Sequence, residues 1–129
     1  MPSVATEQLA RALVLLGAAL AATTASAQEV RLLVQRSPLA GFRYHEAPSL
    51  FDTLVPGTAL ELVREPENAF DPLAVRVEWQ GRKLGYLPRA QNAALAWAMD
   101  QGMPVAARVS ALREHANPRR RVEFEVYVE

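Results

Sequence analysis

A loop at residues 65–71 carries side chains whose types and spacing suit ligand binding. Two prolines, Pro66 and Pro72, mark this acidic stretch, which contains Asn68, Phe70 and Asp71. In a binding site, Asp71 accepts a hydrogen bond from a ligand hydroxyl, Asn68 contacts a base edge or sugar, and Phe70 offers a ring for base stacking. In the alternative interpretation, both polar side chains cap backbone amides of the loop while Phe70 fills the core. The residue types leave both interpretations open.

Two further pairs of residues have the chemistry of a phosphate or base contact. Arg43 can bind a phosphate in a two-pronged way and stack on a base, and Tyr44 can stack and donate its hydroxyl. Tyr86 and Arg89 fall at the end of a predicted strand and the start of a predicted helix, where backbone amides favour anions. The alternatives are a surface position for Arg43 and Arg89 and a core position for Tyr44.

The loop precedes a sequence with the pattern of a β-hairpin. Residues 74–79 alternate, with Val75, Val77 and Trp79 on the side opposite Ala74, Arg76 and Glu78. Gln80-Gly81 predicts a tight turn, and residues 83–87 return as a second strand. A rigid pair of strands would aim the polar side chains of the loop before it.

Hydrophobic periodicity predicts the remaining helices and strands, and glycine and proline residues indicate where they begin and end. After Pro88, residues 89–99 are rich in helix formers and predict one helix with a buried stripe of Ala94, Leu95, Ala98 and Met99. A short helical turn is expected within residues 46–54, and Trp79 and Trp97 are expected to pack. The other predicted strands are residues 30–35, 42–45 (a short strand or extended arm), 58–64, 105–113 and 122–129, the last with Val122, Phe124, Val126 and Val128 facing inward.

About six short strands with antiparallel connections and one helix predict a mainly β domain. The expected architecture is a small, partly closed antiparallel barrel with the helix covering one end. A chain of 129 residues has room for a single domain of this kind.

Composition excludes several classes of function. Lysine plus arginine and aspartate plus glutamate both number 14, and this neutrality argues against strong non-specific nucleic-acid binding, so any such contact must be a local pocket. The basic run 119–121 is interpreted as a solvated loop, because Glu114 and the C-terminal glutamates surround it. Cysteine is absent and only His45 and His115 are histidines, which excludes disulfides, thiolate zinc sites and imidazole clusters. No catalytic set or phosphate loop is present, so we expect no enzyme, no cofactor and no bound metal.

The N-terminus predicts export. Residues 12–22 are apolar or small, and Ala25-Ser26-Ala27 has the small-x-small form that signal peptidase accepts. We expect residues 1–27 to be a cleaved signal peptide and residues 28–129 to be a periplasmic or secreted domain. The alternative is an uncleaved anchor, but the apolar run is much shorter than the roughly 20 residues that span a bilayer.

Four segments in this order resemble the HIRAN domain family. They are Gly41-Phe42-Arg43-Tyr44, Asn68-Ala69-Phe70-Asp71, Ala74-Val75-Arg76-Val77, and Gly81 followed by Leu84-Gly85-Tyr86-Leu87. The family pattern has Pro-Tyr where this chain has Ala69-Phe70. The resemblance covers residues 41–102 and implies an OB-like barrel.

The resemblance also implies a function. HIRAN domains of helicase-like proteins hold the last nucleotides of a single strand at its free 3′ end, with the loop aspartate at the terminal hydroxyl. By this resemblance the chain is a non-catalytic module that captures a single-stranded DNA 3′ end, or a nucleotide-like ligand, in a pocket of Arg43, Tyr44, Asn68, Phe70 and Asp71. ATPase and zinc functions of the larger relatives are not implied, because the motor and the zinc ligands are absent. The alternative is an exported protein-interaction or envelope module that uses the same barrel without nucleic acid.

Overall fold

The computed structural model describes residues 32–128, so the predicted signal peptide lies outside the described residues. The prediction of a mainly β domain with six strands is confirmed, with two short α-helices, one of them where a short helical turn was expected within residues 46–54. The strands are β1 (Leu32–Pro38), β2 (Ala59–Glu65), β3 (Ala74–Trp79), β4 (Arg82–Tyr86), β5 (Val105–Leu112) and β6 (Val122–Val128), and the helices are α2 (Ala47–Leu50) and α3 (Ala93–Asp100).

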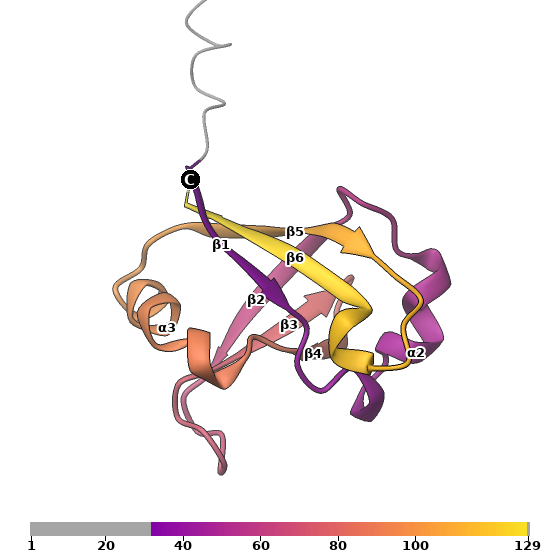
Figure 1. The fold of residues 1–129 in the computed structure, drawn as a ribbon. Coiled ribbons are helices and arrows are strands. Elements are labelled where there is room, and N and C mark those ends of the chain that lie inside the picture. The colour runs from indigo at the N-terminus through magenta and orange to yellow at the C-terminus, as the bar shows by residue number, and fades with distance from the viewer. Residues whose placement is uncertain (1–31, 129) are drawn as a thin grey trace, which may run out of the picture. The chain divides into compact units, whose positions relative to one another are not determined.

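All strand pairs are antiparallel, in the order β1-β6-β5-β2-β3-β4, with α2 and α3 at opposite ends of the sheet (Figure 1). β2 joins the two halves, because Ala59 and Leu60 pair with β5 while the residues from Glu61 onward pair with β3. The sheet is not closed. Its two edges meet at one point, where Ala40, just after β1, exchanges two backbone hydrogen bonds of 2.9 Å with Tyr86 of β4.

The core follows the predicted period of two. Val75 and Val77 of β3 are fully buried, as are Phe124 and Val126 of β6. On the other face of β6, Glu125 is also buried, contrary to expectation. Its carboxylate lies between arginines of the two neighbouring strands, with Nε–O distances of 3.0 Å to Arg36 and 3.2 Å to Arg108, and this pairing is why a charged side chain is tolerated there.

Residues 42–45 do not form the predicted strand or arm. Gly41 has a φ of 72°, a left-handed conformation that glycine adopts without strain, and the chain turns there into a 3-10 helix, Phe42–Tyr44. The Tyr44 N–H donates to the Gly41 carbonyl over 3.0 Å. Phe42 is buried by this turn, whereas Tyr44 is 76% exposed.

The predicted helix 89–99 is divided in two. A 3-10 turn, Arg89–Gln91, precedes α3, which begins after Asn92. The expected buried stripe is partly wrong, because Leu95 is buried but Ala94 is exposed and Ala96 is buried instead. Trp97, which we expected to pack, is 64% exposed. Among residues 32–128, no helix has both the length and the hydrophobicity needed to span a bilayer.

Candidate functional site

The loop between β2 and β3 is built by its own polar side chains. The Asn68 side-chain oxygen accepts hydrogen bonds from the backbone N–H groups of Phe70 (2.9 Å) and Asp71 (3.1 Å). The Asn68 amide donates to Glu65 over 2.9 Å, which ties the loop to the end of β2. Asn68 therefore caps the loop backbone, as one of the two interpretations expected, and one N–H of its amide remains for another partner.

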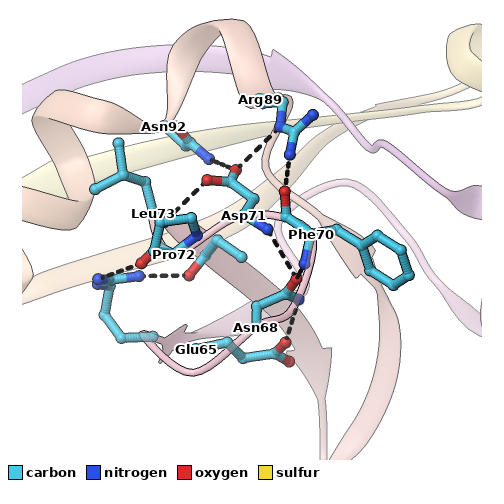
Figure 2. Close-up of polar contacts among 10 residues, drawn as sticks. Glu65, Asn68, Phe70, Asp71, Pro72, Leu73, Arg89 and Asn92 are labelled. Atoms are coloured by element: carbon cyan, nitrogen blue, oxygen red, sulfur yellow. Dashed lines mark hydrogen bonds and ion pairs between the residues drawn. The ribbon is translucent and has the colours of Figure 1, made fainter.

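Asp71 connects the loop to the start of α3. One carboxylate oxygen accepts the Leu73 backbone N–H over 2.9 Å, and the other accepts the Asn92 amide over 2.7 Å (Figure 2). Arg89 lies with its Nε 3.6 Å from the same oxygen that Asn92 contacts. The pKa of Asp71 is lowered from its ordinary 3.8, most of all by the hydrogen bond from the Leu73 N–H. The hydrogen bond from the Asn92 amide and the charge of Arg89 act in the same direction. Asp71 is thus a fixed, ionised acceptor at neutral pH.

Phe70 lies outside the core. Its side chain is 87% exposed, and Figure 2 shows the ring pointing away from the hydrogen-bonded loop. The Arg89 guanidinium donates to the Phe70 carbonyl, so the backbone beneath the ring is held in place. An apolar ring held on a fixed backbone in water can stack against a flat ligand.

A pocket of about 520 Å³ opens between this loop and β4, and we call it the loop pocket. Its floor includes the Tyr86 ring, which His45 meets edge-on at 5.6 Å between ring centroids. The Lys83 ammonium lies 4.5 Å from the centroid of the same ring. Five of the predicted site residues line the pocket, together with His45 and Lys83; these five are Asn68, Phe70, Asp71, Tyr86 and Arg89.

A hydrogen-bonded carboxylate supports the pocket floor. Glu65 accepts the Tyr86 hydroxyl over 2.9 Å and an Arg76 guanidinium hydrogen bond over 2.7 Å. Burial alone would raise the pKa of Glu65, but hydrogen bonds from Asn68, Arg76 and Tyr86 outweigh it and lower the pKa from its ordinary 4.5. Burial, followed by the Lys83 charge, lowers the pKa of His45 from 6.5, with Glu65 acting in the opposite direction. His45 is therefore mainly neutral at pH 7.

Arg43 and Tyr44 do not line the loop pocket. Both side chains are exposed and border a separate hollow of about 330 Å³ beside residues 117–119. The two sites are neighbours along the chain, because Ala40 and His45, on either side of this segment, do line the loop pocket.

Sequence reasoning missed His45 and Lys83. A strict period of two would put Lys83 and Tyr86 on opposite faces of β4. The pairing shifts, however, so that Val77 lies opposite Gly85 and the next residue, Glu78, lies opposite Lys83, which leaves Leu84 as the extra residue of a bulge. Nothing in the local sequence marks this bulge. The turn at Gly41 that places His45 at the pocket was also not predicted, although a glycine favours a turn.

The described residues hold no cluster of three or more potential metal ligands. The carboxylates near the pocket are instead used inside the protein, Glu65 by Arg76 and Tyr86 and Asp71 by the loop and α3. The loop pocket thus brings together an exposed aromatic ring, a fixed carboxylate and two cations, a combination that can contact a flat, polar ligand.

The chain resembles known domains over the described region. A model of the HIRAN domain matches residues 32–129. A crystal structure of a protein from Lactobacillus plantarum superposes with a TM-score of 0.67 at 29% identity, over 77% of this chain and 95% of that protein. The crystal structure of the HIRAN domain of human HLTF superposes with a TM-score of 0.56 at 21% identity, over 76% of this chain and 77% of that one, and this likeness concerns the fold alone. No curated protein sequence matches the chain.

Proposed function

Because the chain belongs to the HIRAN domain family, we propose that it is a non-catalytic module that captures the 3′ end of single-stranded DNA, or a nucleotide-like ligand, in the loop pocket. The observation that carries this proposal is that five predicted residues line one pocket, three from the β2–β3 loop, one from β4 and one from the 3-10 turn that follows it. Its volume of about 520 Å³ falls within the range of small-ligand sites, roughly 300–1,000 Å³.

Phe70 supplies the stacking surface for a terminal base. Its ring is exposed, and stacking on an aromatic side chain contributes about 1–3 kcal/mol per base. A neutral protein can hold a nucleotide by this means, since stacking needs no excess positive charge.

Asp71 supplies the acceptor for the terminal hydroxyl. A carboxylate has about four lone-pair positions, so it can accept from a ligand while it still accepts from Leu73 and Asn92. Those two contacts fix its orientation before a ligand arrives. Lys83 and Arg89 flank the pocket and can contact a phosphate next to the terminal sugar.

A titration tests the proposal. Two single-stranded DNA oligonucleotides, both labelled at the 5′ end, are compared. One has a free 3′ hydroxyl and the other a 3′-deoxy end, which lacks the hydroxyl and adds no charge. We expect the 3′-deoxy strand to bind about tenfold more weakly, because it cannot form the hydrogen bond to a charged acceptor. Equal binding of the two strands, or binding of neither, would overturn end capture.

The second candidate is an exported protein-interaction module without a nucleic-acid ligand. The neutral charge and the signal peptide expected at residues 1–27 favour it. Export is itself a proposal, and the mass of the protein recovered from a periplasmic fraction tests it. We expect a chain beginning at Gln28, whereas an intact chain from Met1 confined to the cytosol would contradict export.

A further inference from the structure

A second hollow continues from the loop pocket across the surface. It has a volume of about 560 Å³, and we call it the proline hollow after Pro38 and Pro88, which line it. It shares Ala40 and Arg89 with the loop pocket, and Arg119 also lines it. A ligand that leaves the loop pocket past Arg89 therefore enters a mainly apolar trough that a second arginine lines.

Arg119 stands where three hollows meet. Besides the proline hollow, it borders the hollow of Arg43 and Tyr44 and a third one, of about 270 Å³, that Arg113 and Arg120 also line. We call Arg43, Arg113, Arg119 and Arg120 the arginine surface. Arg43 is far from the other three in the sequence and is brought to them by the contact of the 3-10 turns Phe42–Tyr44 and Pro118–Arg120. Arg113 is held near the second turn by its backbone N–H, which donates to the Arg121 carbonyl over 2.8 Å.

The turn that carries Arg119 and Arg120 is rigidly built. The Asn117 side chain accepts the Arg119 backbone N–H over 3.0 Å, the Arg120 N–H donates to the Asn117 carbonyl over 3.0 Å, and Pro118 occupies the first helical position. Both arginine side chains point from a fixed backbone into water. Little conformational entropy of the backbone is lost when such a turn binds a ligand.

The four guanidinium groups of the arginine surface have no acidic partner within 4.0 Å among residues 32–128. Six other described arginines are paired: Arg36 and Arg108 with Glu125, Arg64 with Asp100, Arg76 with Glu65 and Glu78, Arg82 with Glu46, and Arg89 with Asp71. Arg121, next to this surface in the sequence, donates instead to the His115 carbonyl over 2.7 Å. Glu123, an acidic residue that lines the same hollow as Arg113, Arg119 and Arg120, accepts a hydrogen bond from Ser110 over 2.8 Å. Among residues 32–128, the four arginines of the arginine surface thus stand together without an acidic partner, and Arg119 also lines the trough.

We propose that the arginine surface binds the backbone phosphates of the nucleotides that precede the captured 3′ end, with the proline hollow as the path between the two. This inference rests on the proposed function of the loop pocket and adds a longer footprint to it. The alternation of cation, apolar trough and cation suits a single strand, whose phosphates and bases alternate along its length. Arg119 and Arg120 of the basic run 119–121, interpreted from sequence as a solvated loop, then have a role in binding.

The length of the oligonucleotide distinguishes binding at the loop pocket from binding at the arginine surface. A thymidine dinucleotide reaches only the loop pocket, while an octanucleotide extends over the arginine surface. With 5′-labelled oligonucleotides of both lengths, we expect the wild-type protein to bind the octanucleotide more tightly. We expect the Arg119→Ala/Arg120→Ala protein to bind the octanucleotide about tenfold more weakly, and its salt slope to fall by about 0.7 for each phosphate that the variant no longer neutralises. Dinucleotide affinity should stay unchanged.

The matched control is Arg82→Glu, which changes the net charge by the same two units at one exposed arginine that lines none of these hollows and whose partner Glu46 is also exposed. Equal losses in the control and the test protein would overturn the inference, because net charge alone would then explain them. Equal affinity of the wild-type protein for the dinucleotide and the octanucleotide would overturn the inference as well.

The dinucleotide tests the proposed function separately. If it binds in a way that depends on its 3′ end, the proposed function stands, and if it does not bind, the proposed function is overturned. Tighter binding of an acidic peptide than of the octanucleotide would assign the surface to a protein partner.

Discussion

Asp71 serves the fold and faces the proposed ligand at the same time. Its carboxylate joins the β2–β3 loop to α3 through Leu73 and Asn92 and also lines the loop pocket. A simple Asp71→Asn substitution mixes the two roles, because an amide in this position turns an N–H toward the Asn92 amide. The buried Asn92 offers a way to separate them.

We therefore predict the behaviour of an exchange. Asp71→Asn alone should lower both the melting temperature and the affinity for a free 3′ end. Asp71→Asn/Asn92→Asp restores a donor–acceptor pair between the two positions and the net charge, so it should recover much of the melting temperature. Affinity should stay at least about tenfold below wild type, since the carboxylate has left the pocket. Recovery of affinity in the exchanged protein would show that Asp71 acts only through the fold.

Phe70 is predicted to act on binding alone. Its ring is 87% exposed, so Phe70→Ala should leave the melting temperature nearly unchanged while affinity falls about fivefold or more because stacking is removed. The salt dependence of binding should not change, because no phosphate contact is removed. Trp97→Ala is the control, as its ring is also exposed, at 64%, but lies on α3 outside the loop pocket. A similar loss of affinity in both proteins would exclude a specific stacking role for Phe70.

At the scale of the elements, the pocket depends on how closely β1 and β4 approach each other. A Cβ added to Gly85 would lie 2.3 Å from the Ala40 carbonyl oxygen and 3.0 Å from a Leu39 methyl group. Only glycine permits the Ala40–Tyr86 bridge, and both bridge residues line the loop pocket. The single contact between the sheet edges thereby shapes the pocket wall.

Gly85→Ala is predicted to open this contact. We expect a loss of about 1–3 kcal/mol in the free energy of unfolding, measured by urea titration, because the backbone at Ala40 must move. Ligand affinity should fall as well. Val109→Ala, at a buried position of β5 outside the pocket, provides a control of similar destabilisation. Equal affinities of the two variants would mean that the bridge does not shape the pocket.

β6 is the strand on which the core depends most. Phe124 is fully buried, and β6 pairs along its length with both β1 and β5. Phe124→Ala should cost about 3–5 kcal/mol, close to the whole stability of a small domain. Circular dichroism during heating should show an early, broad transition. A cooperative transition near the wild-type temperature would contradict the central place of Phe124 in the core.

Hydrophobic periodicity could predict the elements whose residue pattern depends only on burial of one face of the element itself. The alternation in β3 and β6 and the apolar residues of β2 reflect burial of one strand face, which the sequence records directly. The start of α3 was misplaced because Asn92 is held by Asp71, a contact across the fold. The same reason applies to the site: the loop residues could be found by type, but the bulge that brings Lys83 beside Tyr86 depends on pairing with β3.

For the whole molecule, neutrality conceals an uneven distribution of charge. The formal net charge is zero, yet the cations around the loop pocket and the arginine surface lie on adjoining hollows. An average over the chain predicts weak attraction for nucleic acid, whereas a local field of this kind supports a short contact. We therefore expect binding limited to a few nucleotides, without the steep salt dependence of long basic grooves.

The direction of the pKa shifts predicts how the stability of the whole domain depends on pH. Hydrogen bonds and ion pairs lower the pKa values of Glu65, Asp71, Asp100 and Glu125. The ionised carboxylates therefore stabilise the folded chain above their ordinary pKa values, and this contribution is lost as the pH falls through the lower values of the folded state. Burial lowers the pKa of His45, so the unfolded chain takes up that proton first, and stability begins to fall below pH 6.5.

We accordingly predict a two-stage loss of stability on acidification. Urea titrations should show a shallow decline in the free energy of unfolding below pH 6.5, where His45 contributes, and a steeper one below pH 4.5, where the carboxylates contribute. His45→Gln should remove the upper stage and leave the lower one, because glutamine does not titrate. If the upper stage persists in this variant, another group causes it. If stability instead rises on acidification, the carboxylates are not stabilised in the folded state, and the hydrogen bonds of Glu65 and Asp71 that build the loop pocket do not hold in solution.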